Sequence, residues 1–155
     1  MSSLDELYQE VILDHQRNPR NFARLPTANR QAAGENPLCG DRVTVYLEVV
    51  DGVIRDISFK GEGCAIAKAS ASMMTGAVKG KTLTEAAETV RRFHQMITGG
   101  QDPSFDIETL GKLAVFAGVV AFPVRVKCAS LAWHTLLEAM RERQGSVPSG
   151  SEEGA

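Results

Sequence analysis

The chain has 155 residues, of which 43% are hydrophobic and 23% charged, and its formal net charge is −2. This size and composition are those of a single globular domain with a core of its own. The acidic balance argues against a dedicated nucleic-acid-binding protein, and the lack of an apolar run of about 18 residues argues against a membrane span.

The residues that say most about chemistry are the three cysteines, Cys39, Cys64 and Cys128. The first residues lack the basic-then-apolar pattern of a signal peptide, and the cysteine count is odd. We therefore expect a reducing compartment, the cytoplasm. There, cysteines are more often metal ligands or reactive thiols than disulfide partners.

The N-terminal segment is predicted to be a helix followed by a long loop. Ser3 and Glu6 form a capping box, and apolar residues recur at helical spacing, which predicts an amphipathic helix over residues 4–17. An Asn-Pro pair then ends the helix. The polar stretch 21–37 is predicted to be a loop.

Two alternating segments, residues 42–50 and 53–60, predict a β-hairpin around Asp51-Gly52. A two-residue loop would pair Val49 with Ile54 and set polar residues of the second strand opposite apolar residues of the first. A three-residue loop, which pairs Val45 with Ile57, keeps one face apolar. We expect the three-residue loop, because one face of the hairpin must cover a core.

The second half of the chain is predicted to be mainly helical. A second capping box, Thr82 with Glu85, starts one of the helices, and Pro123 is interpreted as a break before the last one, so that Cys128 opens it. The predicted helices are 65–79, 83–97, 107–121 and 128–144, with a loop at 98–106. The whole is predicted to be one α+β domain over residues 1–144, a small antiparallel sheet with helices packed on one face, and residues 145–155 are predicted to be a disordered tail.

The predicted hairpin brings together residues that are far apart in the sequence. Cys39 and Asp41 are two residues apart and so project to the same side of an extended strand. In the expected register Gly61 lies opposite Asp41 and Gly63 lies opposite Cys39, and Cys64 is the next residue. Directly paired residues lie about 4.5–5.5 Å apart. Two cysteines and one carboxylate should therefore meet at the open end of the hairpin.

Cys64 and Cys128 are both predicted to open helices, where the helix dipole favours a thiolate. Arg125 and Lys127 would add positive charge beside Cys128. Three thiolates and the carboxylate of Asp41 suit a tetrahedral zinc ion. A carboxylate is displaced more easily than a thiolate, so we infer a labile, reactive metal site.

Simpler interpretations stand beside this one. A cysteine considered alone is more often a core residue than a ligand, and Asp41 could cap a turn. No histidine stands at zinc-motif spacing from a cysteine. The residues expected only to pack in the core or lie on the surface are His15, His94, His134, Met73, Met74 and Trp133.

Five segments carry a family resemblance: DHQRNPRN (14–21), NPLCGD (36–41), GEGCAIAKASASMMT (61–75), VKGK (78–81) and FPVRVKCASLAWHTL (122–136). Together they resemble the iron–sulfur cluster assembly proteins of the SufU/IscU type, which are related to the N-terminal domain of NifU. Lys127 precedes the last cysteine where the IscU branch has a histidine, and residues 98–106 resemble an insertion of the SufU branch. The resemblance therefore favours the SufU branch, with Asp41 as the fourth metal ligand.

The resemblance implies a zinc-binding protein that accepts persulfide sulfur from a PLP-dependent cysteine desulfurase of the SufS type. Its metal ligands would be Cys39, Asp41, Cys64 and Cys128. Cys39 is the expected sulfur acceptor, Cys128 is the alternative acceptor, and Cys64 is expected to remain a ligand. Two other roles stay open: a scaffold that carries a transient iron–sulfur cluster on the same ligands, and a zinc-stabilised module that only activates the desulfurase.

Overall fold

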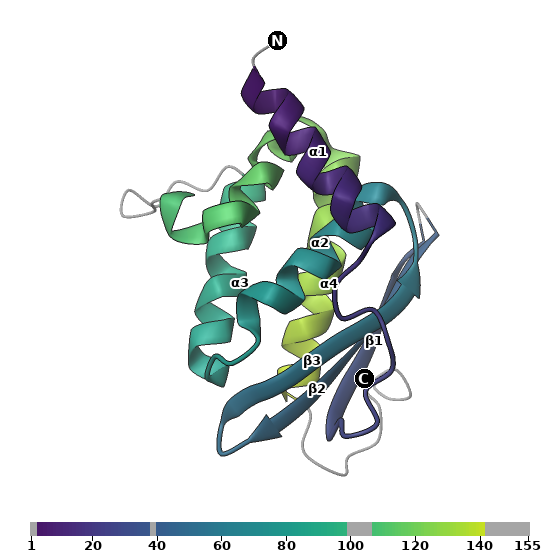
Figure 1. Cartoon of the computed structure of the whole chain (residues 1–155), viewed down its shortest axis with the longest axis vertical. Coiled ribbons are helices and arrows are strands. Elements are labelled where there is room, and N and C mark those ends of the chain that lie inside the picture. Colours follow the sequence, from purple (N-terminus) through teal and green to yellow (C-terminus); the bar gives the residue numbers. More distant parts are fainter. Residues whose placement is uncertain (1–2, 38–39, 99–106, 142–155) are drawn as a thin grey trace.

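A three-stranded antiparallel sheet packed against helices forms the part of the chain that the structure, a computed structural model, describes: residues 3–37, 40–98 and 107–141 (Figure 1). In chain order the elements are α1 (Ser3–Arg17), β1 (Arg30–Asn36), β2 (Asp41–Val50), β3 (Val53–Glu62), α2 (Ala65–Val78), α3 (Leu83–Thr98), η1 (Ile107–Ala121) and α4 (Pro123–Arg141). The strand order is β1-β2-β3. The α+β prediction is confirmed.

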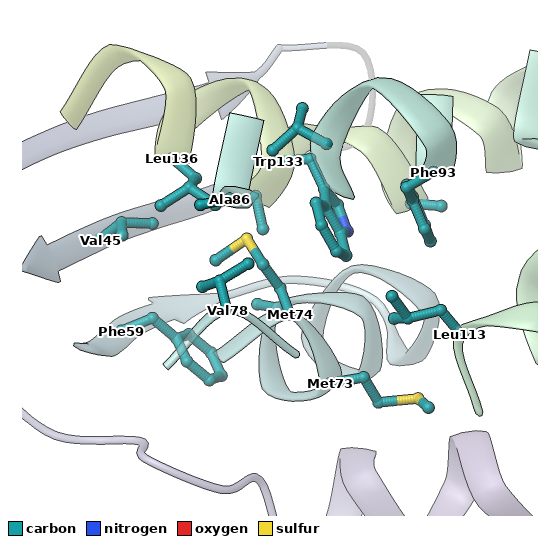
Figure 2. Close-up of a cluster of buried hydrophobic side chains, with 14 of the residues drawn as sticks. Val45, Phe59, Met73, Met74, Val78, Ala86, Phe93, Leu113, Trp133 and Leu136 are labelled. Atoms are coloured by element: carbon teal, nitrogen blue, oxygen red, sulfur yellow. The ribbon is translucent and has the colours of Figure 1, made fainter. Parts of the chain in front are cut away.

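The helices lie on one face of the sheet in two tiers. α4 packs on β1 and β2, α2 packs on β3 and α4, and α3 and η1 lie farther from the sheet (Figure 1). Figure 2 shows Met74 and Val78 of α2 facing Trp133 and Leu136 of α4. Met73, Met74 and Trp133 are buried, as predicted. Within the described residues, no helix is both long and apolar enough to cross a membrane.

The predicted loop over 21–37 is wrong, because residues Arg30–Asn36 form the edge strand β1. This segment, RQAAGEN, has few apolar residues, and it becomes a strand by pairing with β2 from Arg30↔Leu47 to Asn36↔Asp41. α4 lies close against β1: a Cβ on Gly34 would collide with Oγ1 of Thr135. The strand therefore depends on contacts with distant parts of the chain rather than on local propensity.

The hairpin register also differs from the prediction. Asp51 and Gly52 both have positive φ, 54° and 76°, as a two-residue type I′ turn requires. A bulge then follows, because Val49 pairs with Ile54 while Glu48 pairs with Asp56, which leaves Arg55 as the extra residue. Beyond the bulge, Val45 pairs with Phe59 and Leu47 with Ile57.

The apolar face of the hairpin is nevertheless the predicted one. The register beyond the bulge lies two residues from the expected register, and a shift of two keeps each side chain on the same face. Residues Asn21–Ala23 cover the outer edge of β3, where Phe59 N donates to Asn21 O at 3.0 Å and Ala23 N donates to Phe59 O at 3.0 Å. This backbone pairing closes an otherwise open sheet edge.

The remaining elements agree with the predictions except at one helix start. The Thr82–Glu85 capping box is present, with reciprocal hydrogen bonds of 3.0 Å. η1 is helical, as predicted, and is interrupted at Gly111, where φ is 58°. The last helix begins at Pro123 rather than near Cys128, because proline is favoured at the first position of a helix. The predicted loop at 98–106 (beyond Thr98, the last residue of α3) and the predicted tail 145–155 lie outside the described residues.

Candidate metal centre

Asp41 is the first residue of β2 and is buried, with 1% of its surface exposed. The turn before it is closed by a hydrogen bond of 2.8 Å from Gly40 N to Asn36 O. Gly40 has a φ of +73°, which glycine adopts without strain. Burying a carboxylate without partners costs free energy, so the groups that contact Asp41 indicate its role.

Those contacts come from Cys64, which is the N-cap of α2. The backbone N–H of Cys64 donates to Oδ1 of Asp41 at 3.0 Å, and its thiol lies 3.8 Å from Oδ2. The sulfur also accepts a hydrogen bond from Ala67 N at 3.4 Å, as a capping side chain does. Cys64 is exposed to solvent. The sulfur and the carboxylate oxygen are therefore close enough to bind the same cation.

Two glycines allow β3 to pass close to Asp41. Gly61 pairs with Val43, not with Asp41 as predicted, and it has a φ of +153° and no room for a Cβ against Arg42 O. A Cβ on Gly63 would lie 2.6 Å from Oδ1 of Asp41. The two-residue shift of register thus places Gly63, and with it Cys64, beside Asp41.

Cys128 is buried, with 4% of its surface exposed, and it lies in the second turn of α4. The prediction that it opens the helix is wrong, so the helix-dipole argument does not apply to this thiol. Its position is set instead by packing between α2 and α4. Ser70 Oγ donates to the carbonyl of Ala129 at 2.6 Å, and Trp133 Nε1 donates to Ser70 Oγ at 2.9 Å.

Ser70 is a positioning residue that the sequence analysis does not identify. It is fully buried, and it links the helix that begins after Cys64 to the helix that contains Cys128. The sequence does contain one indication of such a residue, because a buried tryptophan needs a hydrogen-bond acceptor for its indole N–H. The sequence pattern assigns Trp133 only to core packing.

Asp41, Cys64 and Cys128 come together, with their ligand atoms all within 4.8 Å of one another. In a tetrahedral zinc site, Zn–S and Zn–O bonds of usual length put neighbouring sulfur and oxygen atoms about 3.6 Å apart. The distance of 3.8 Å between Cys64 Sγ and Asp41 Oδ2 is close to this value. The donor set and its spacing therefore fit a borderline-soft ion such as zinc.

The other predicted site residues stand apart from this triad. Cys39 lies outside the described residues. Arg125 and Lys127 are both exposed on α4, and the guanidinium of Arg125 lies 4.7 Å from the centre of the Phe122 ring. Among the described residues, neither side chain forms an ion pair with Asp41, so their supporting role remains a prediction.

Comparison with known proteins identifies relatives that span nearly the whole chain. The family model of the NifU-like N-terminal domain matches residues 7–129. The chain is 40% identical to the zinc-dependent sulfurtransferase SufU of Bacillus subtilis, over 93% of this chain and 96% of that protein. It is 38% identical to the iron–sulfur cluster assembly scaffold protein IscU of Streptococcus pyogenes, over 91% and 87% of the two chains.

Solved structures give the same relationship. FiSufU from Fervidobacterium islandicum AW-1 superposes with a TM-score of 0.81 at 35% identity, covering 88% of this chain and 98% of that one. The N-terminal part of a NifU-like protein from Brucella abortus superposes with a TM-score of 0.75 at 28% identity, covering 90% and 96%. The fold, the Asp41–Cys64–Cys128 triad and these matches lead to one conclusion: the chain belongs to the NifU-like N-terminal domain family.

Proposed function

We propose that the chain is a zinc-dependent sulfur acceptor in iron–sulfur cluster assembly, with Cys39, Asp41, Cys64 and Cys128 as the zinc ligands. The observation that carries the proposal is the convergence of three of these ligands within 4.8 Å. The name of the 40%-identical relative, a zinc-dependent sulfurtransferase, supports the same interpretation. Cys39 is the fourth ligand because it precedes Asp41 by two residues, a span of at most about 7 Å.

The sulfur donor is a cysteine desulfurase of the SufS type, which carries a persulfide on its own cysteine. A thiolate of this chain attacks the outer persulfide sulfur, a new S–S bond forms, and the desulfurase cysteine leaves as a thiolate. No net oxidation or reduction occurs. When bound, zinc keeps the ligand cysteines deprotonated at neutral pH.

Cys39 is the acceptor in this proposal, and the surroundings of the other two thiols support the choice. Cys128 is buried in the packed interior, where a persulfide on another protein does not reach it. Cys64 is exposed, but its sulfur is held by Ala67 N and lies against Asp41. Attack requires an accessible sulfur that is able to move.

The test combines anaerobically purified, zinc-loaded chain with a SufS-type desulfurase and cysteine. Mass spectrometry of the cysteine peptides then locates any gain of one sulfur atom. We expect that gain on Cys39, and we expect the Cys39→Ser variant to lose it. A normal sulfur gain in the Cys39→Ser variant would move the role to Cys128, and no gain on any cysteine would refute sulfur transfer.

A second candidate function is a scaffold that assembles an iron–sulfur cluster on the same ligands. It is favoured by relatives named as scaffolds, among them the 38%-identical protein of Streptococcus pyogenes, and by the suitability of thiolates for such clusters. The same preparation distinguishes the two. Tightly held iron with acid-labile sulfide in place of zinc would favour the scaffold.

A further inference from the structure

Two histidines that take no part in the candidate metal centre lie side by side on neighbouring helices. His94 is on α3 and His134 is on α4, and their ring centroids are 5.7 Å apart. Each directly follows a core aromatic residue, Phe93 or Trp133, and those two rings stack at 4.3 Å. Figure 2 labels both aromatic residues in the buried cluster. The stacked pair fixes the backbone from which both imidazoles project.

The two imidazoles are exposed, and neither forms a hydrogen bond to another of the described residues. His15, the third histidine of the chain, differs, because its Nδ1 lies 2.7 Å from Ser72 Oγ. Partial burial of the His134 ring against the two helices, and next the charge of His94, lower the pKa of His134 below 6.5. A lowered pKa favours the neutral imidazole, which is the form that binds metals.

The pair opens into a hollow of about 310 Å³ between α3 and α4, lined also by Val90, Arg91 and Ser130. Among the described residues, no carboxylate belongs to this lining. The guanidinium of Arg91 is turned to Glu88, with contacts of 2.6 and 3.0 Å. The lining thus offers imidazole nitrogens rather than the oxygen-rich set that Ca²⁺ and Mg²⁺ require.

The spacing of the rings matches chelation of one ion. With metal–nitrogen bonds of usual length, two imidazoles on a tetrahedral or wider angle have ring centres about 5–6 Å apart. The observed 5.7 Å falls in this interval. The ring spacing is thus compatible with both imidazoles binding the same ion.

We propose that His94 and His134 form a second metal site, which binds a divalent transition-metal ion of the imidazole-preferring class, such as Zn²⁺, Co²⁺, Ni²⁺ or Cu²⁺. Among the described residues, the one group of three protein ligands close enough to share an ion is Asp41, Cys64 and Cys128. The His94–His134 site therefore has two protein ligands, and water completes the coordination. Such a site exchanges its ion readily. His134 follows Cys128 by six residues, about 9 Å along α4, so the two sites are separate.

The test uses the full chain with its cysteine centre first saturated with zinc, and Ni²⁺ as the probe. NMR signals of the three imidazoles are followed during the titration, since bound paramagnetic Ni²⁺ broadens nearby protons. We expect the His94 and His134 signals to broaden together, while His15 is unchanged and the zinc content stays constant. This readout does not depend on sulfur transfer.

Three matched variants complete the test. His94→Gln and His134→Gln should each weaken Ni²⁺ binding by about tenfold or more, as expected for loss of one of two chelating ligands, and His15→Gln should not change it. Both positions are exposed, and an unaltered unfolding midpoint checks that the variants fold. Equal Ni²⁺ affinity in all four proteins, equal broadening of His15, or Ni²⁺ uptake only as zinc leaves would each overturn the proposal.

Discussion

Replacing Gly63 by alanine should weaken metal binding without removing a ligand. The new Cβ would lie 2.6 Å from Oδ1 and 3.0 Å from Cγ of Asp41, whereas ordinary contact begins near 3.4 Å. The carboxylate would therefore have to retreat by about 0.8 Å, several times the tolerance of about 0.2 Å in a metal–ligand distance. Asp41 is 1% exposed, so the retreat has little room.

Two measurable losses follow from that displacement. The hydrogen bond of 3.0 Å from Cys64 N to Asp41 Oδ1 lengthens beyond useful range, which should cost about 1.5–3 kcal/mol because the acceptor is charged. Zinc affinity should fall by about 10- to 100-fold, the usual effect of disturbing the surroundings of a ligand.

Chelator competition measures the zinc affinity of the Gly63→Ala variant, and urea unfolding of the metal-free chain measures its stability. The matched control is Gly76→Ala, since Gly76 is in α2 and a Cβ at this position would have nothing within 4 Å. That substitution should leave zinc affinity unchanged and raise the free energy of unfolding by about 0.5–1 kcal/mol. A Gly63→Ala variant that binds zinc as tightly as the natural chain would refute the placement of Asp41 in the metal centre.

Three further predictions concern positioning, metal removal and pH. Ser70→Ala removes a hydrogen bond to Ala129 O and leaves the buried Trp133 indole N–H without its acceptor. Urea unfolding should therefore show a free energy of unfolding lower by about 2–4 kcal/mol. An unchanged unfolding midpoint would contradict the positioning role of Ser70. A strong chelator should lower the thermal midpoint of the zinc-loaded chain, since ligand at about 1,000 times its Kd stabilises by about 4 kcal/mol, and Asp41→Asn should show a smaller shift in the same scan. Burial lowers the pKa of His15 and His134 below 6.5 in the folded chain. Because the unfolded chain takes up protons first as pH falls, the free energy of unfolding should decrease below about pH 6.5. Replacing both histidines by glutamine should flatten that pH dependence.

The parts of the fold that could be predicted are those whose signal is local. The alternating strands 42–50 and 53–60 and the Thr82–Glu85 capping box each show their structure in a few consecutive residues. β1 could not be recognised in this way, because RQAAGEN has few apolar residues and is a strand only through its pairing with β2. Pro123 allowed two interpretations, a break or a first helical position, and the second holds.

The candidate site also has one part that local sequence signals predict and another that depends on distant contacts. Asp41 and Cys64 were predicted to meet because a hairpin forces its open ends together, and this survives a register error of two residues. The place of Cys128 could not be derived, because it depends on the buried Ser70 link between α2 and α4. Cys39 lies outside the described residues, so its part in the site stays a prediction.

The bulge at Arg55 acts on chemistry at the far end of the hairpin. Each of its strands is ten residues long, so about 33 Å of sheet separates the Asp51-Gly52 turn from Asp41. In a regular ladder without this bulge, Arg55 would pair with Glu48, and every later residue of β3 would shift by one position along β2 and exchange faces. Glu62, rather than Gly63, would then lie opposite Asp41. The bulge at Arg55, a surface residue distant from the metal centre, thus determines which residues at the end of β3 can bind an ion together with Asp41.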